Sequence, residues 1–470
     1  MICALSELNE SGLFQTKVVS RIKIYVLRLF YALFFYYMGG NMKVSKIKGT
    51  LDYFGRDVKK YRYIENVARS ISKQFGYLEI VTPIFEATEV FARGVGEGTD
   101  IVNKEMYTFL DRSEKSLTLR PEGTAGVSRA YVENKMYVDP GLKKLFYFGQ
   151  MFRCERPQAG RYRAFTQFGI EALGPGSAYL DADVIYFGYL FLQKLGIKNV
   201  KVAINTIGSK SGRAKYEEAL KEYFSEHIDE MCNDCKTRLE KNPLRILDCK
   251  VDAKSDIMKN APKIIDYLSE EDIAYFDKVL KCLDKLGVEY VIEQKLVRGL
   301  DYYNHTVFEF IYDDKNSNID GLTLLGGGRY NGLSRQFDGP ETDAIGFGTG
   351  VERLMLVLDE LGLFKDDEKL VDVVVINIGE ETKLEALSLA AFLRSNNVSC
   401  EIDYVSSNLK PQFKLSERVN APYIIIIGSE EVENGVFKLK NTILKTEEMR
   451  KIEELNEIFN IEGEKYAYKK

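Results

Sequence analysis

Four arginines, two glutamines and two glutamates are concentrated in the segment FRCERPQAGRYRAFTQFGIE, residues 152–171. This segment joins two apolar runs, and the upstream run LFYFGQMFR (145–153) is rich in aromatic residues, which favours a strand. We therefore expect two paired strands connected by an arginine-rich loop. Guanidinium groups bind phosphates and base edges through parallel hydrogen bonds. The loop is therefore predicted to bind a phosphate-bearing ligand or a nucleotide.

The downstream strand has two unlike faces. Alternation places Phe165, Gln167 and Glu171 on one face. It places Phe168 and Ile170 on the other. An aromatic ring, an amide and a carboxylate in one row make a poor hydrophobic core. We interpret that row as the floor of a ligand site.

The composition of the chain limits how it can work. At 470 residues it is long enough for more than one domain, and its 45% hydrophobic and 29% charged residues are typical of a globular protein. The net charge of −5 means that local basic patches, rather than an overall field, would have to hold a polyanion. The seven scattered cysteines indicate reduced thiols and a cytoplasmic location. With only His227 and His305 available, arginines and carboxylates are expected to carry any catalysis.

The first 41 residues form an unusual extension. Residues 22–38 are aromatic and apolar, but Lys23 and Arg28 interrupt them, and the uncharged remainder is short for a membrane span. No small-residue cleavage site of a signal peptide follows. We expect a mis-called start, with the natural protein beginning at Met42. An interfacial or membrane anchor is the alternative, and no stable membrane partner is expected.

From about Lys43 the pattern predicts an α+β enzyme. Three units precede the arginine-rich segment: a helix over 56–75, an interrupted strand over 77–86 and a strand–turn–helix unit over 116–133. Three more follow it: strands over 307–312 and 322–333 and a strand–helix unit over 344–361. Residues 210–290 are mostly helical and charged, as expected of an inserted module. From Val371, apolar strands alternate with helices, which predicts a separate α/β domain of about 100 residues.

Three further motifs could bind a ligand, although each has a structural explanation when taken alone. LTLRPEGT (117–124) could be a strand end followed by a helix cap, and GGGRY (326–330) could be a tight bend. VRGLDYYNHT (297–306) could be a surface strand with a solvated arginine. Their occurrence together, and in this order with 152–171, argues strongly against a purely structural reading.

This combination of motifs resembles the histidyl-tRNA synthetases, a family of class II aminoacyl-tRNA synthetases. TPIFE around Pro83 resembles the first class motif, 152–171 the second, and AIGFGTGVERL (344–354) the third. LVRGLDYYNHTVFEF (296–310) and LLGGGRYNGL (324–333) resemble the two histidine-specific motifs.

The resemblance implies an antiparallel-sheet catalytic domain with a mainly helical insertion and a C-terminal α/β anticodon-binding domain. The expected boundaries are an extension at 1–41, a catalytic domain at 42–209 and 291–366, an insertion at 210–290 and an anticodon-binding domain at 371–470. A homodimer is implied, because the first class motif builds the dimer interface in that class.

The implied reaction is ATP-dependent activation of L-histidine, followed by transfer to histidine tRNA. Both first reactants are anionic, so the catalyst must neutralise charge and align them. The resemblance makes Arg298 and Arg153 catalytic at the α-phosphate. It also assigns ATP binding to Glu155 and to Arg163, which would reach toward the γ-phosphate. Phe165 would stack on adenine, and Arg353 would close the nucleotide from the other side. Mg²⁺ is expected with ATP.

The same resemblance assigns the histidine pocket and the RNA contacts. Glu171 would accept the imidazole N–H and Tyr303 would donate to the other ring nitrogen. Glu122 and Thr124 would hold the α-amino group. The remaining assignments are Gln167 and Tyr302 in the pocket, Arg156 and Gln158 at the tRNA acceptor end with its extra 5′ guanosine, and Lys410, Lys414 and Arg418 as anticodon candidates. A solvated helix face is the alternative for those last three.

Three alternatives concern the wider reading of the chain. Cys232, Cys235 and Cys249, with upstream His227, could bind zinc, although ordinary thiols are the expected interpretation and no metal is assigned. A non-catalytic paralogue that senses histidine would lack the anticodon domain and catalytic residues that this chain retains. A stand-alone RNA-binding protein would not need the ATP and histidine motifs.

Overall fold

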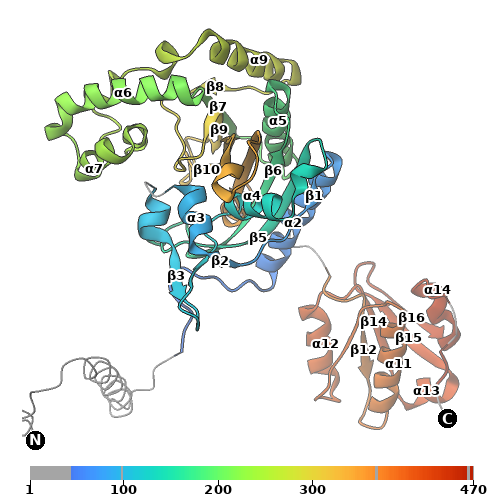
Figure 1. Cartoon of the computed structure of the whole chain (residues 1–470). Helices are drawn as coiled ribbons and strands as arrows, with labels where there is room; N and C mark the ends of the chain where they lie inside the picture. The colour runs from blue at the N-terminus through green and yellow to red at the C-terminus, as the bar shows by residue number, and fades with distance from the viewer. Residues whose placement is uncertain (1–43, 97–98, 366–368, 463–465, 469–470) are drawn as a thin grey trace, which may run out of the picture. The chain divides into compact units, whose positions relative to one another are not determined.

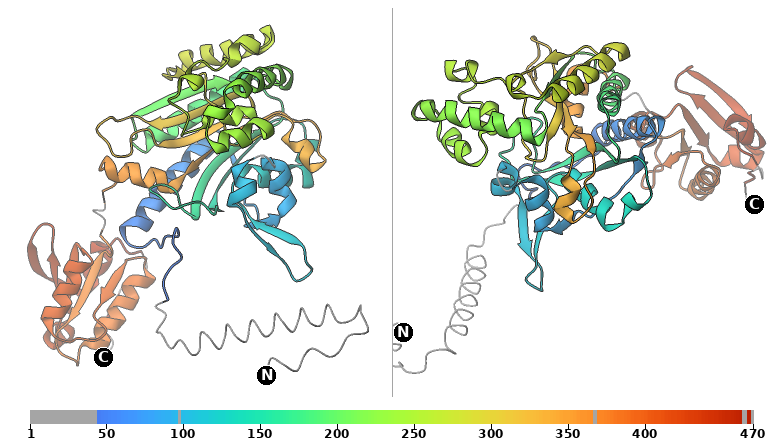
Figure 2. Two further views of the ribbon diagram at one scale, coloured as in Figure 1. Left: turned by 90° about the vertical axis from the view of Figure 1, so that its left-hand side faces the viewer. Right: turned by 45° about the horizontal axis from the view of Figure 1, so that its top comes forward.

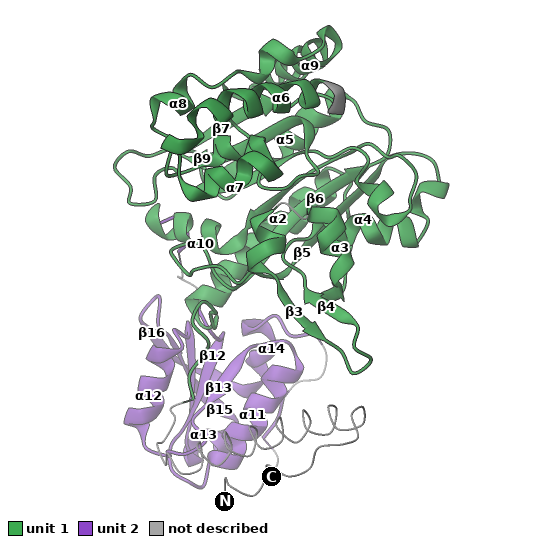
Figure 3. Ribbon diagram, turned by 60° about the vertical axis from the view of Figure 1, so that its left-hand side comes forward, with its two compact units in different colours: residues 1–361 green, residues 362–470 purple. Residues whose placement is uncertain are grey.

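The computed structural model describes residues 44–96, 99–365, 369–462 and 466–468. It divides into two compact units, residues 1–361 and 362–470, so the division falls near the predicted start of the C-terminal domain (Figure 3). The expected mis-called start at 1–41 lies outside the described residues. No helix within the described ranges has the length and apolar character needed to cross a bilayer.

In the described part of the larger unit, eight strands form one mixed, mostly antiparallel sheet (Figure 1). Only the outermost pairs, at each edge, are parallel. In spatial order the strands are β1 (Leu78–Glu79), β5 (Lys143–Phe152), β6 (Ala164–Leu173), β11 (Ala344–Gly350), β10 (Thr323–Arg329), β9 (Asn304–Tyr312), β7 (Val200–Thr206) and β8 (Val291–Ile292). The predicted α+β class and its antiparallel catalytic sheet are confirmed.

One face of this sheet carries the hydrophobic core. Phe168 of β6 and Phe347 of β11 pack on Phe187 and Phe191 of α5 (Ala178–Lys194). The same face is covered by α2 (Arg56–Gln74) and α10 (Val351–Glu360). Because side chains alternate along β6, the residues between these core positions point to the opposite face. That opposite face is available for a ligand.

A small antiparallel sheet and two helices lie beside the large sheet. The order of its strands is β2 (Phe85–Ala87), β4 (Ser116–Leu119) and β3 (Tyr107–Leu110), and the β3–β4 hairpin projects from the body of the unit (Figure 1, Figure 2). The helices are α3 (Thr88–Val95) and α4 (Thr124–Glu133). Arg120 connects the two sheets, since its Nε donates to Gln150 O at 2.7 Å and its Nη1 to Thr82 O at 2.9 Å.

The inserted segment is mainly helical, as predicted. Its elements include α6 (Lys210–His227), α7 (Asn233–Lys241), the 3₁₀ helix η4 (Pro243–Asp248), α8 (Asp256–Lys259) and α9 (Glu270–Leu286). Its core is continuous with the sheet, because Tyr216 and Leu220 belong to the same buried cluster as Ala203 and Val307. The insertion is therefore built onto the catalytic domain rather than standing apart from it.

The C-terminal unit is a five-stranded sheet with helices on both faces. Its spatial order is β13 (Cys400–Ile402), β12 (Val373–Asn377), β14 (Tyr423–Ile427), β15 (Val436–Asn441) and β16 (Thr446–Lys451). The first three strands are parallel, and α11 (Lys383–Ser395) and α12 (Leu409–Arg418) cover opposite faces. This agrees with the predicted α/β alternation. The antiparallel β15–β16 hairpin was not anticipated.

Candidate active site

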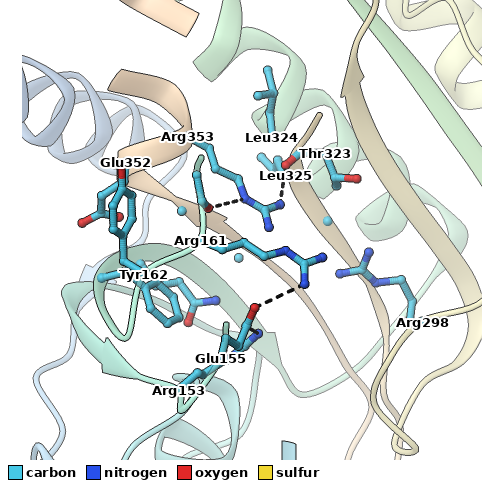
Figure 4. Close-up of a pocket in the computed structure, with 16 residues that line it drawn as sticks. Arg153, Glu155, Arg161, Tyr162, Arg298, Thr323, Leu324, Leu325, Glu352 and Arg353 are labelled. Carbon is cyan, nitrogen blue, oxygen red and sulfur yellow. Dashed lines mark hydrogen bonds and ion pairs between the residues drawn. The ribbon is translucent and has the colours of Figure 1, made fainter. Parts of the chain in front are cut away.

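A pocket opens on the ligand face of the large sheet (Figure 4). Four arginines line it, coming from the β5–β6 hairpin, the loop before β9 and the first turn of α10: Arg153, Arg161, Arg298 and Arg353. Only two of the described lining residues, Glu155 and Glu352, are acidic. The excess of positive charge makes this an anion-binding pocket.

The guanidinium of Arg298 lies against β10, next to Gly326. Its guanidinium forms an ion pair with Glu309 of β9 and lies 5.7 Å from the ring centroid of Tyr303. Burial acts to lower the pKa of Arg298, but the carboxylate of Glu309 raises it above its ordinary value. A Cβ atom at Gly326 would lie 2.5 Å from the Arg298 Nη atoms, so glycine there makes room for the guanidinium.

Arg353 reaches across the pocket to two backbone carbonyls. Its Nε donates to Gly160 O at 3.1 Å and its Nη1 donates to Thr323 O at 2.6 Å. Burial, followed by the positive charges of Arg161 and Arg153, lowers the pKa of Arg353 to about 10. An anion placed among these arginines would relieve that repulsion.

Arg153 and Phe165 form a stacked pair at the start of the hairpin. The Arg153 guanidinium carbon lies 5.4 Å from the Phe165 ring centroid, and its Nε donates to Pro121 O at 2.9 Å. Glu155 lies 3.7 Å from Arg153 and 3.2 Å from Arg161. The structure therefore brings the predicted Arg153, Glu155 and Phe165 to one pocket wall.

Arg163, predicted to reach toward the γ-phosphate, is not among the residues that line this pocket. Its backbone N–H donates to Gly49 O at 2.7 Å, and a Cβ at Gly49 would lie 2.9 Å from the Arg163 side chain. Arg161 lies in the pocket instead, and its guanidinium extends into the same space as that of Arg298 (Figure 4). The backbone pairing of Gln158 with Arg161 makes this segment a turn, so strand alternation does not place its side chains.

Glu171 lies at the buried end of the same strand face, with 1% of its surface exposed. The Thr124 hydroxyl donates to its Oε1 at 2.7 Å, and the Tyr330 hydroxyl donates to its Oε2. Burial raises the pKa of Glu171 to about 8, although the two hydroxyls oppose the shift. This carboxyl is therefore set to exchange a proton or a hydrogen bond near neutral pH.

Glu122 occupies the N-terminus of α4. Its carboxylate accepts hydrogen bonds from the backbone N–H groups of Thr124 at 2.7 Å and Ala125 at 2.8 Å. Burial raises its pKa, and the two amides act against this. Tyr302 packs against Tyr303 and Tyr330, with ring centroids 4.7 and 5.5 Å away. The predicted histidine-pocket residues thus form one buried polar group with aromatic walls.

Gln167 connects the two halves of the site. It lines the arginine pocket, and its Oε1 accepts from Gly123 N at 3.2 Å and from the Tyr147 hydroxyl at 3.3 Å. Glycines of β11 make room for this row of side chains. A Cβ at Gly348 would lie 2.5 Å from Gln167 Nε2, and one at Gly346 would lie 2.0 Å from Glu171 Oε2.

Four residues of the site were missed by the sequence reasoning: Tyr147, Glu309, Tyr330 and Glu352. Tyr330 and Glu309 lie within the motifs that carried the resemblance, so their positions offered a signal. Glu352 accepts from Thr166 N at 2.8 Å and from the Tyr53 hydroxyl at 2.9 Å. The contact between Tyr53 and Glu352 joins residues that are far apart in the sequence, so no local sequence pattern reveals it.

Two family models match the chain. The model described as histidyl-tRNA synthetase matches residues 49–354, and the one described as anticodon binding domain matches residues 372–460. The chain belongs to the histidyl-tRNA synthetase family. The predicted resemblance is therefore confirmed.

Individual relatives agree with this assignment. The chain is 48% identical over 399 residues to a histidine–tRNA ligase of Anoxybacillus flavithermus, covering 84% of this chain and 93% of the relative. It is 46% identical over 427 residues to the histidine–tRNA ligase of Listeria monocytogenes, covering 90% of this chain and all of the relative. The crystal structure of Staphylococcus aureus histidyl-tRNA synthetase matches with a TM-score of 0.76 and 40% identity, covering 88% of this chain and 99% of that one.

A more distant structure shares only the fold. It is a Bacillus halodurans chain titled as an ATP phosphoribosyltransferase regulatory subunit/histidyl-tRNA synthetase, with a TM-score of 0.59 and 22% identity, covering 83% of this chain and all of that one. The fold by itself therefore does not separate a ligase from a regulatory protein. The side chains of the site must be used for that distinction.

The residues predicted to face RNA lie on exposed surfaces. Arg156 and Gln158 are exposed on the hairpin that borders the pocket. In the C-terminal unit, Lys410, Lys414 and Arg418 are exposed on α12. Both locations are accessible to a macromolecule, and the family match assigns the second unit to anticodon binding.

The cysteines considered for zinc also come together. Cys232, Cys235 and Cys249 form a group with Asp252. His227, considered as a fourth ligand, is not part of this group, and its ring instead packs 5.0 Å from that of Tyr223.

His305 has a left-handed backbone with φ of 49° at a bulge in β9, and its Nδ1 lies 3.5 Å from Asp272. Neither histidine lines the arginine pocket.

Proposed function

We propose that this chain is a histidine–tRNA ligase. It activates L-histidine with ATP to form histidyl-adenylate and diphosphate, then transfers the histidyl group to the 3′ end of histidine tRNA and releases AMP. The observation that carries the proposal is the continuity of an arginine-lined pocket with a buried polar group built around Glu171. Gln167 belongs to both, so an anionic nucleotide and a small polar amino acid can meet there.

The first step joins two anions, and its barrier falls when their charges are neutralised in place. The histidine carboxylate oxygen attacks the α-phosphorus, and the bond to the diphosphate oxygen breaks. Arg298 and Arg153 hold the α-phosphate and the carboxylate during this attack. Arg161 takes the γ-phosphate role that was predicted for Arg163, because Arg161 lines the pocket and Arg163 does not.

Adenine and the metal complete the nucleotide site. Phe165 provides an aromatic face, and Arg353 closes the pocket from β11 and α10. ATP would bring Mg²⁺ as its bound counter-ion, which would lower the charge on the leaving diphosphate. The carboxylates of Glu155 and Glu309 lie beside Arg153 and Arg298, the two arginines proposed to hold the α-phosphate.

Recognition of histidine depends on groups that match a neutral imidazole. Glu171 accepts the ring N–H, and Tyr303 donates to the other ring nitrogen. Glu122 and Thr124 hold the α-amino group, and Tyr302 and Gln167 complete the pocket. A site of buried polar groups rejects analogues that lack the matching hydrogen bonds by several orders of magnitude, so discrimination requires no editing step.

The transfer step requires RNA to approach the same pocket in the cytoplasm. The exposed Arg156 and Gln158 contact the acceptor end and its extra 5′ guanosine, since arginine matches the acceptor edge of guanine. The C-terminal unit holds the anticodon, where unpaired bases are read by stacking and edge hydrogen bonds.

A homodimer is the proposed functional form. Apolar side chains are exposed around the first class motif and on the adjacent small sheet: Leu78 at 71%, Val81 at 84%, Ile84 at 48%, Phe85 at 53%, Phe109 at 44% and Leu110 at 66%. A patch of this kind on a described surface marks an interaction site. Its location in the motif that builds the dimer interface in this class supports pairing through this surface.

The competing function is histidine sensing without catalysis. A sensor would bind histidine through the Glu171 group but would have no use for an arginine-lined nucleotide pocket. Charging of a histidine tRNA transcript with labelled histidine tests the proposal. Accumulation of histidyl-tRNA that requires ATP supports the ligase, whereas histidine binding with no charging in folded protein would support the sensor.

A further inference from the structure

We propose that the inserted segment binds one structural Zn²⁺ ion through Cys232, Cys235, Cys249 and Asp252. Each of these residues offers one ligand atom, and all four atoms lie within 4.8 Å of one another. None of the four lines the arginine pocket described above, although Cys249 lines an adjoining cavity together with Arg298 and Arg353. Zinc binding by this group does not require the proposed function.

The local sequence brings the ligands in as two matched pairs. Cys232 and Cys235 have two residues between them, and so do Cys249 and Asp252, with thirteen residues between the pairs. Cys232 is the N-cap of α7 and Cys235 lies in its first turn, while Cys249 directly follows η4. Two such pairs on separate turns are the arrangement of a zinc-binding module, with aspartate here in the fourth position.

The distances agree with those of a tetrahedral site. Cys232 Sγ and Cys249 Sγ are 3.6 Å apart, and Cys249 Sγ lies 3.5 Å from Asp252 Oδ2. Zinc bonds of about 2.3 Å to sulfur and about 2.1 Å to oxygen would place such ligands roughly 3.5 to 3.8 Å apart in a tetrahedron. Two of the ligand separations therefore already match those around one ion, and all four ligand atoms lie within 4.8 Å of one another.

The ligand chemistry selects the metal. Thiolates favour zinc and other soft metals, whereas Mg²⁺ and Ca²⁺ require oxygen ligands. Four protein ligands close the coordination sphere, which indicates a structural rather than a catalytic site. Backbone groups orient the ligands: Asp252 N donates to Cys249 Sγ at 3.4 Å, and Cys232 N donates to Asp252 Oδ2 at 3.2 Å.

The location gives the ion a structural task. It would join α7, the helix that carries Arg238, to the turn that follows η4, the 3₁₀ helix that carries Arg245. Arg238 Nη1 donates to Arg245 O at 3.0 Å, and both guanidinium groups form ion pairs with Asp100, at 3.5 and 3.4 Å. A Cβ at Gly299, next to Arg298, would lie 3.1 Å from Arg245 Nη1. The ion would thus stiffen the part of the insertion that contacts the loop of Arg298.

Metal analysis of the full chain, purified without chelator, tests the site. The wild-type protein is expected to contain about one zinc per chain by mass spectrometry of the metal. Cys235→Ser and Asp252→Ala are expected to lose most of it. Cys282→Ser, whose thiol lies in α9 outside the group, is the matched control and should retain the full amount.

Cobalt provides a readout that does not depend on variants that might fold poorly. Co²⁺ reconstitution of the wild-type chain should give thiolate-to-cobalt charge-transfer absorption and the visible bands of tetrahedral cobalt. Folded wild-type protein with less than about a tenth of an equivalent of zinc and no such spectrum would overturn the proposal. A Cys232–Cys249 disulfide found by mass spectrometry in protein prepared under reducing conditions would also overturn it.

Discussion

The Thr124 hydroxyl donates a 2.7 Å hydrogen bond to Oε1 of Glu171, a carboxyl that is almost completely buried beneath the β11 glycines. Burial raises the pKa of Glu171 to about 8, so the group changes charge slightly above neutral pH. In the proposed function this carboxylate accepts the imidazole N–H of the substrate. Proton release from Glu171 is then linked to histidine binding.

The first prediction concerns pH. Ionised Glu171 binds histidine better than the protonated form, so the histidine Kd should fall as pH rises through about 8. With one linked proton, the decrease between pH 7 and 8.5 is roughly eightfold. Calorimetry over this range measures it. Glu171→Gln cannot ionise, so it should bind histidine weakly with a flat pH profile while its ATP affinity changes little; equal losses for both ligands would contradict the assignment.

The second prediction separates two neighbouring arginines. Arg161→Ala should raise the KM for ATP in pyrophosphate exchange by tenfold or more, because a charge-assisted hydrogen bond contributes about 1.5–3 kcal/mol. Arg163→Ala should change the KM much less, since its side chain packs over Gly49 outside the pocket. A larger effect at Arg163 would restore the original sequence-based assignment.

These two arginines also show where sequence reasoning reached its limit. The alternation of Phe168 and Ile170 with Gln167 and Glu171 was predictable, because β6 is a regular strand with a core on one face only. The choice of Arg161 over Arg163 among the loop arginines was not predictable, because a turn closed by backbone pairing obeys no period.

Tertiary pairing accounts for the other misses. Tyr147 reaches Gln167 only because strand register places Tyr147 opposite Gly169, where no side chain blocks the hydroxyl. The β16 sequence TEEMRK is polar and mostly exposed, so it had none of the apolar alternation that revealed the other strands. Asp252 repeats the two-residue spacing of the cysteine pair, a signal that cysteine counting alone overlooked.

The third prediction uses the glycines of β10. Gly326→Ala would place a Cβ against the flexible end of Arg298, so the guanidinium must shift while the fold is retained. Exchange activity should fall at least tenfold, on the scale of a lost charged contact, with little change in melting temperature.

Gly327→Ala is the contrasting variant. Its Cβ would lie 2.2 Å from the backbone oxygen of Gly346, which cannot move without displacing β11. This variant should lower the melting temperature clearly in a thermal scan. Full exchange activity in Gly326→Ala would show that the position of Arg298 does not matter.

The fourth prediction separates RNA contact from activation. Arg156→Ala should reduce kcat/KM for tRNA charging by roughly tenfold or more, the discrimination expected of one arginine–guanine contact. Histidine-dependent exchange should not change, because Arg156 does not line the nucleotide pocket. Arg112→Ala, at another exposed arginine, serves as the control. Unchanged charging in Arg156→Ala would remove this residue from the RNA interface.

The fifth prediction addresses assembly. Val81→Glu would place a charge in the exposed apolar patch at the first class motif, where burial in a dimer would leave it unpaired. Sedimentation should show a monomer of 53.7 kDa where the wild type shows twice that mass. Val405→Glu, at a valine that is 90% exposed in the C-terminal unit, should remain dimeric. A wild-type monomer would contradict the proposed interface.

Histidine-dependent exchange of labelled pyrophosphate into ATP tests the central claim most directly, because it reports the reversible activation step without RNA. The chain should catalyse exchange only with histidine and Mg²⁺ present, and Arg298→Ala should lose it while retaining histidine binding. Folded, histidine-binding wild-type protein with no exchange would contradict the account and favour a histidine sensor.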